Sequence, residues 1–281
     1  MRVRTPSFMR PIIGIFILLV CCLFIQKPHA EEKPSEINFS AELSSNPLTI
    51  TAEKVIDPLT FLGNDNHIYR LAGLDVPGVT SFTESNIATQ AKEWLEKAVA
   101  GQTLYIYQSR DLTARQNRMG HFPVHAVRKF DNTWLQGAMI EEGLARVLTS
   151  ESMTEMAIPM LVAERKAREA NKNLWADAQF KILSPEESLT VRNDIYIVEG
   201  TVKSAAINNN IVYLNFGDDW RKDFTIVVPA ALRQKLSRAN IDLLSFKDKK
   251  IRIRGFIESK NGPSITLTHF QQMELLEDSP H

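Results

Sequence analysis

Short segments with alternating apolar and polar residues follow one another from residue 48 onward, separated by turn residues. The pattern predicts strands over 48–56 and 67–76, joined by a connection at 58–63, then an amphipathic helix over 87–99. Two more strands are expected over 103–108 and 122–127. We therefore expect the segments before the helix to supply three strands and those after it to supply two, which is the order of a five-stranded OB barrel.

The remainder of the chain extends this barrel and then repeats its element order. Two further helices are expected, one around residues 135–142 and one over 159–171. The polar stretch at 179–189 is predicted to be a linker, followed by a second series of short strands with one helix through Leu232 and Leu236. We therefore expect an α+β protein that is mainly β, with a barrel domain at 48–178 and a second OB-like barrel at 190–277.

The first thirty residues have the order of an export signal. A basic start leads into an uncharged apolar run over residues 11–25, which is shorter than the roughly 20 residues that span a bilayer as a helix. We expect a signal peptide over 1–30 and a linker over 31–47, which predicts a periplasmic or secreted protein. The alternative is an uncleaved anchor, and only in that case is a membrane expected as a partner.

Charge and cysteine content limit the remaining function classes. The chain has 33 basic and 33 acidic residues. All four charged residues of the first thirty are basic, so the rest of the chain has a net charge of −4. Whole-surface attraction to nucleic acid is therefore not expected, and phosphate recognition would need a local patch. Both cysteines, Cys21 and Cys22, lie in the signal, so a cleaved protein has no disulfide, zinc thiolate or thiol nucleophile.

Three charged residues could form a phosphate site on the first barrel. Arg70 lies within a predicted strand, Asp75 lies where that strand ends, and Arg118 lies in the loop before another strand. Two guanidinium groups facing one carboxylate can hold a phosphodiester and stabilise charge in its transition state. The alternative is a structural network of ion pairs among the same three residues.

Five segments in order resemble the staphylococcal nuclease, or thermonuclease-like, family. They begin at residues 55, 101, 114, 132 and 161, and the resemblance covers about 48–176. It implies an OB-type barrel with calcium-dependent hydrolysis of nucleic acid. It also implies that Arg70 and Arg118 are the two catalytic arginines and that Asp75 is a calcium ligand.

Two positions depart from the family in ways that affect catalysis. Leu59 stands where the family has its other calcium-binding aspartate, and Gly78 stands where it has the glutamate that activates water. Calcium needs oxygen ligands, and glycine accepts no proton, so we expect calcium-dependent hydrolysis to be weak or absent. A replacement base could come from Asp57, Asp65 or Glu84.

The second barrel offers a separate candidate surface. Strand alternation predicts that Lys250, Arg252 and Arg254 share one face, and Trp220 is expected at a hairpin tip. Cations beside aromatic residues on OB barrels bind single-stranded nucleic acid, so these residues could form such a surface. The alternative is that they form a strand face exposed to solvent.

Three functions follow from these residues. The first is a degenerate nuclease-like module that binds nucleic acid or a partner, the second is a phosphodiesterase with a relocated base or different metal, and the third is a protein-interaction module of the cell envelope.

Overall fold

The computed structural model describes residues 37–80, 86–111, 116–191, 193–219, 221–259 and 262–276. Residues Ile37–His281 belong to one compact unit. The expected signal and residues 31–36 of the expected 31–47 linker lie outside the described residues. Among those residues, no helix has both the length and the apolar character needed to cross a membrane.

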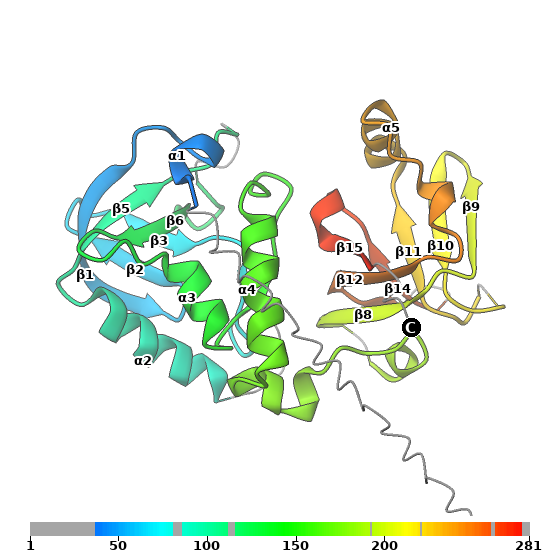
Figure 1. Ribbon diagram of the computed structural model, residues 1–281, viewed down its shortest axis with the longest axis horizontal. Coiled ribbons are helices and arrows are strands. Elements are labelled where there is room, and N and C mark those ends of the chain that lie inside the picture. Colours follow the sequence, from blue (N-terminus) through cyan, green and yellow to red (C-terminus); the bar gives the residue numbers. More distant parts are fainter. Residues whose placement is uncertain are drawn as a thin grey trace, which may run out of the picture. The chain divides into compact units, whose positions relative to one another are not determined.

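A closed five-stranded barrel forms the first half, with strand order β1-β2-β3-β6-β5 (Figure 1). Its strands are β1 (Leu48–Asp57), β2 (Thr60–Gly63), β3 (Ile68–Leu71), β5 (Thr103–Tyr107) and β6 (Phe122–Arg128). The barrel and the mixed α+β class confirm the predicted fold class. The expected connection at 58–63 is wrong in detail, because β2 lies within it and pairs with both β1 and β3.

Helices and a small sheet complete the first half. They are α1 (Phe39–Glu42), α2 (Ile87–Val99), α3 (Leu135–Glu141), α4 (Ala157–Glu169), η2 (Asn173–Ala176), β4 (Leu74–Asp75) and β7 (Arg146–Val147). Helix α2 buries Ile87, Ala91 and Leu95 on one face, as the sequence pattern predicts. Leu43, just after α1, is fully buried, so the end of the expected 31–47 linker packs on the barrel.

Two separate sheets form the second half. One has the order β13-β14-β11-β10-β9 and the other has the order β15-β12-β8. Their strands are β8 (Ile195–Thr201), β9 (Ser204–Asn208), β10 (Ile211–Asn215), β11 (Thr225–Val228), β12 (Lys250–Phe256), β13 (Glu258–Ser259), β14 (Pro263–Thr266) and β15 (Met273–Leu276). The expected second OB-like barrel is not confirmed, because the described strands do not close into one.

Short helices connect and cover these sheets. They are η3 (Ala178–Phe180), η4 (Glu187–Thr190), α5 (Ala230–Arg238), η5 (Leu243–Phe246) and η6 (Phe270–Gln272). The predicted linker at 179–189 is packed structure, since Phe180 and Leu183 are buried and Leu183 bridges to Val198 in β8.

The outer face of β6 carries a buried histidine. His125 is 1% exposed, its ring centroid lies 5.8 Å from that of Trp134, and its Nδ1 has no hydrogen-bond partner among the described residues. Burial lowers the pKa of His125 to about 3, so the folded protein holds the neutral ring. An unfolded chain takes up this proton near its ordinary pKa of roughly 6.5.

We therefore predict that acid destabilises the protein partly through His125. Stability from the neutral ring is complete above about pH 6.5 and is lost as pH falls toward about 3, because the unfolded state is protonated first. Lowering the pH from roughly 7 to 5 should reduce the free energy of unfolding in both proteins. The reduction should be about 2 kcal/mol smaller in His125→Phe than in the wild type. Urea unfolding at both pH values measures this difference, and equal losses in the two proteins would contradict it.

Candidate functional site

Arg70 lies at the partly exposed surface of the barrel. It is in the middle of β3, opposite Thr60 on β2 and Pro123 on β6. Its Nη1 donates to Thr60 Oγ1 at 3.0 Å and lies 3.7 Å from Asp57 Oδ2. The arginine side chain is 26% exposed, and its Nε and Nη2 have no partner among the described residues. The guanidinium is thus held in place by a hydroxyl group while donors remain free for an anion.

Arg118 is exposed and lies in a tight turn that precedes β6. The Asn117 side chain accepts hydrogen bonds from the backbone N–H groups of Met119 and His121, at 2.9 and 3.0 Å. Gly120 has φ +76°, which glycine adopts without strain. The Arg118 side chain forms no ion pair with the described residues and is exposed. Within the described residues no contact joins Arg118 to Arg70. The turn that carries Arg118 precedes β6, and β6 pairs in parallel with β3, the strand of Arg70.

Asp75, the third predicted site residue, is completely buried. Arg146 donates from Nε to Asp75 Oδ2 at 2.7 Å and makes a second, shorter contact from Nη2. Thr80 donates its hydroxyl to the other carboxylate oxygen, Oδ1. Both oxygens of Asp75 are therefore occupied by protein donors. Asp75 forms a structural ion pair with Arg146, and the alternative network among Arg70, Asp75 and Arg118 is not found in the described residues.

The residues present do not fit calcium. Leu59 is fully buried in the barrel core, and its backbone N–H is bonded to Asp57 Oδ1 at 2.8 Å. The carboxylate of Asp75 is neutralised by Arg146, and no group of three or more His, Cys, Asp or Glu side chains that could hold a metal occurs in the described ranges. A hard cation that takes six to eight oxygen ligands finds none of the family's carboxylates available here.

Of the two proposed replacement bases that the structure describes, Asp57 lies beside Arg70 and Asp65 does not. Asp65 already accepts hydrogen bonds from Tyr69 Oη at 2.6 Å and pairs with His67 at 3.1 Å. Gly78 is exposed in a turn with φ +87°, so a side chain at this position would be strained. Glu84 falls outside the described residues. Asp57 is partly exposed and keeps its Oδ2 free of hydrogen bonds within the described structure.

The cations of β12 share one face, as alternation predicts, but acidic groups neutralise them. Lys250 pairs with Glu199 at 2.7 Å, and Arg252 pairs with Glu199 at 2.6 Å. Arg254 is 1% exposed and pairs with Glu164 at 2.5 Å and Glu274 at 2.6 Å. A nucleic-acid surface on this face is not supported, because Arg254 is inside the protein and the other two cations already have counter-charges. Trp220 lies outside the described residues.

Sequence reasoning missed the two partners that define these buried pairs. Arg146 follows Ala145 and precedes Val147, so a charge sits within an apolar segment. Glu164 occurs four residues after Met160 and three before Ala167, on the face that α4 buries. The helical spacing of Glu164 could have predicted a buried partner, because a charged residue on the apolar face of a helix needs one.

Buried polar contacts also link the barrel half to the later sheets. Arg254 Nη1 on β12 donates to the Val147 carbonyl at 3.1 Å, and Thr149 Oγ1 lies 2.7 Å from the ring nitrogen Nε2 of His269. Arg146 Nη2 donates to the carbonyl of Ile195 at 3.3 Å. The Asp75 pair is thereby tied to the start of β8.

Comparison with known families identifies part of this chain. Residues 69–177 match the family model described as staphylococcal nuclease homologue. A comparison with curated proteins gave no match. The matched segment begins in β3, so β1 and β2 complete the barrel from outside it. Residues 69–177 are therefore similar to the staphylococcal nuclease family, and they supply β5, β6 and most of β3 to the closed five-stranded barrel.

Proposed function

We propose that the nuclease-like barrel binds single-stranded nucleic acid through Arg70 and Arg118 and does not hydrolyse it with calcium. The observation that carries this proposal is the Arg70 guanidinium, which Thr60 holds at 3.0 Å while the family's metal positions are a buried leucine and a neutralised aspartate. Phosphate oxygens suit the free donors of an arginine fork. The basic and apolar N-terminal pattern supports action outside the cytoplasm.

The test is fluorescence anisotropy of a labelled single-stranded DNA or RNA with the purified full chain. Arg70→Ala and Arg118→Ala should each weaken binding about tenfold, the effect of losing one charge-assisted hydrogen bond. Each should also reduce the slope of log affinity against log salt by about 0.7, as expected for one phosphate contact on a single strand. Arg165→Ala, which removes an exposed arginine from α4, is the matched control and should bind as the wild type does.

Affinity that does not change with salt, or that survives Arg70→Ala, would reject the proposal. In that event the envelope interaction module becomes the better function for the barrel. Circular dichroism of each variant must match the wild type, which separates a lost contact from a lost fold.

A second candidate function is hydrolysis with a relocated base. Asp57 favours it, because its free Oδ2 lies 3.7 Å from Arg70 Nη1 and could accept a proton from water. This function requires turnover of nucleic acid with calcium, magnesium or manganese that is lost in both Asp57→Asn and Arg70→Ala. Binding without turnover in all three metals supports the first function.

A further inference from the structure

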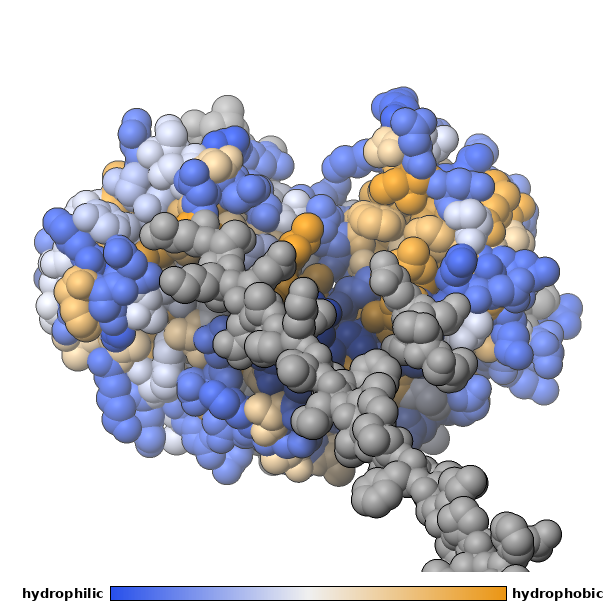
Figure 2. All heavy atoms as spheres, in the orientation of Figure 1, coloured by the Kyte–Doolittle hydropathy of each residue, from blue (hydrophilic) through white to orange (hydrophobic). Residues whose placement is uncertain are grey.

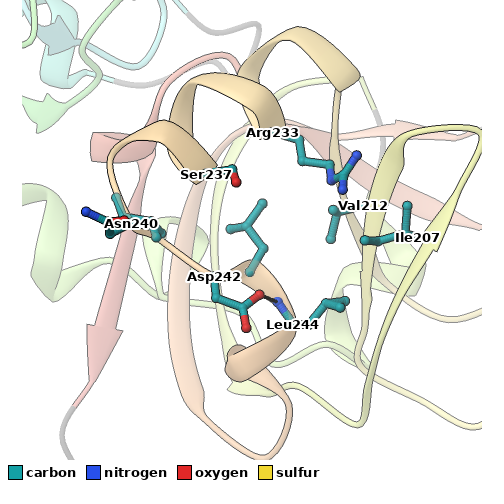
Figure 3. A pocket seen from close by; sticks show the side chains of 9 residues that line it. Ile207, Val212, Arg233, Ser237, Asn240, Asp242 and Leu244 are labelled. Atoms are coloured by element: carbon teal, nitrogen blue, oxygen red, sulfur yellow. Dashed lines mark hydrogen bonds between the residues drawn. The ribbon is translucent and has the colours of Figure 1, made fainter.

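A pocket of about 400 Å³ opens on the second half, and all of its lining residues come after residue 177, where the family match ends. Helix α5, helix η5 and the hairpin of β9 and β10 enclose it. Figure 3 shows Ile207 and Val212 from the hairpin and Leu244 from η5 pointing into the pocket, with Arg233 and Ser237 from α5 above them. Ile207 is 42% exposed and Leu244 is 41% exposed. The lining also includes the polar residues Ser237, Asn240 and Asp242. Because the apolar side chains lie beside the Arg233 cation, the pocket suits a ligand that combines an apolar group with an anion.

Strand β9 beside this pocket is an exposed sheet edge. It pairs with β10 and ends its sheet within the described strands. Its sequence, SAAIN, contains no charged residue and no proline, the features that commonly prevent an edge strand from pairing with another chain. Figure 2 shows hydrophobic residues reaching the surface of the second half beside α5. The free backbone of β9 can therefore accept an added strand.

A strand added to β9 would place some of its side chains in the pocket. Side chains directly opposite each other on neighbouring strands point to the same face of a sheet. A residue placed opposite Ile207 would therefore point toward Leu244 and the pocket. Extended peptides bind other sheet edges in this manner, with backbone hydrogen bonds supplying affinity and side-chain pockets supplying specificity.

Charge determines which peptide fits. Residues 230–249 contain five basic and two acidic side chains, a net charge of +3, although the chain beyond its first thirty residues is acidic. Arg233 Nη1 donates to the neutral Asn210 Oδ1 at 3.3 Å and makes no ion pair among the described residues. Asp242, the acidic residue of the pocket, caps η5 by accepting from the Leu244 N–H at 2.9 Å. A second copy of this chain fits poorly, because the same basic surface would face itself.

We propose that β9, α5 and η5 form a docking groove for an extended, acidic segment of a partner protein. The segment adds a strand to β9, places an apolar side chain between Ile207 and Leu244, and sets a carboxylate beside Arg233. This interaction is independent of the phosphate site on the barrel.

The test uses the full chain and a labelled peptide in which glutamate alternates with valine or leucine. Ile207→Asp and Arg233→Glu should each weaken peptide binding at least tenfold. Ile207 is partly exposed, so its replacement spares the core. Arg165→Glu, an exposed charge reversal on α4 outside residues 230–249, is the matched control and should change affinity less than threefold. Hydrogen exchange should slow at residues 204–208 when the peptide binds.

Four results would overturn the proposal. Equal binding of a peptide with lysine in place of glutamate would exclude charge recognition, and equal binding of a backbone N-methylated peptide would exclude strand addition. Displacement of the peptide by a single-stranded oligonucleotide in the Arg70→Ala protein would assign the groove to nucleic acid. A dimer in sedimentation that Ile207→Asp dissociates would assign the edge to a second copy.

Discussion

Asp75→Ala should lower the free energy of unfolding by about 3–5 kcal/mol, the cost of leaving a buried charge without its partner. Arg146 is 4% exposed and would lose the carboxylate that it contacts through two nitrogens. Urea unfolding followed by circular dichroism measures the loss. Arg70→Ala, at a partly exposed ion pair of 3.7 Å, should cost less than about 1 kcal/mol in the same experiment.

A double variant and a metal titration distinguish this structural role from calcium binding. Asp75→Ala combined with Arg146→Met removes both charges and should recover much of the stability lost in Asp75→Ala. Millimolar calcium should leave the wild-type unfolding midpoint unchanged, because a ligand stabilises a fold only when it binds the native state. A midpoint that rises with calcium in the wild type but not in Asp75→Ala would show that Asp75 binds the metal.

Arg254→Met should also destabilise the protein by about 3–5 kcal/mol. It leaves Glu164, which is fully buried, without the guanidinium that lies 2.5 Å from its Oε2. Burial alone would lower the pKa of Arg254, but the charges of Glu164 and Glu274 outweigh it and keep the pKa above its usual value. The Arg254 guanidinium is therefore charged in the folded protein. Its removal takes away the counter-charge of the buried Glu164 carboxylate.

Two variants serve as controls for the stability of Arg254→Met. Lys250→Ala removes a half-exposed cation from the same strand face and should cost less than about 1 kcal/mol. Arg254→Met with Glu164→Leu should be more stable than Arg254→Met alone, because no buried charge remains. If Arg254→Met unfolds at the same urea concentration as the wild type, the buried pair contributes no stability.

The first half could be predicted from sequence because its signals are local. Alternation in the strand around Arg70 and the apolar face of α2 each depend on residues close in the chain. The second barrel was not confirmed for the opposite reason. The order of strands was visible, but pairing such as the parallel contact of β11 with β14 depends on long-range geometry that no local pattern encodes.

In the candidate site too, the sequence predicts features that depend on neighbouring residues and misses those that depend on distant ones. Leu59 and Gly78 are readable as departures from a family motif, and the structure adds that Leu59 lies in the core. Asp75 could not be assigned correctly, because its partner Arg146 is distant in sequence and pairs with it only through β4 and β7. The charges of β12 were expected at the surface for a related reason, since the acids that cover them come from β8, β15 and α4.

The contact between Arg254 and Glu164 also bears on how this protein could have evolved. The family match ends at residue 177, yet the cation that neutralises an acid inside the matched segment is supplied from β12. A genetic exchange that transplanted the matched segment alone would carry a buried, uncompensated acid into its new host. Selection for folding would therefore favour inheritance of the two halves together, and changes at positions 164 and 254 should be accepted only in concert.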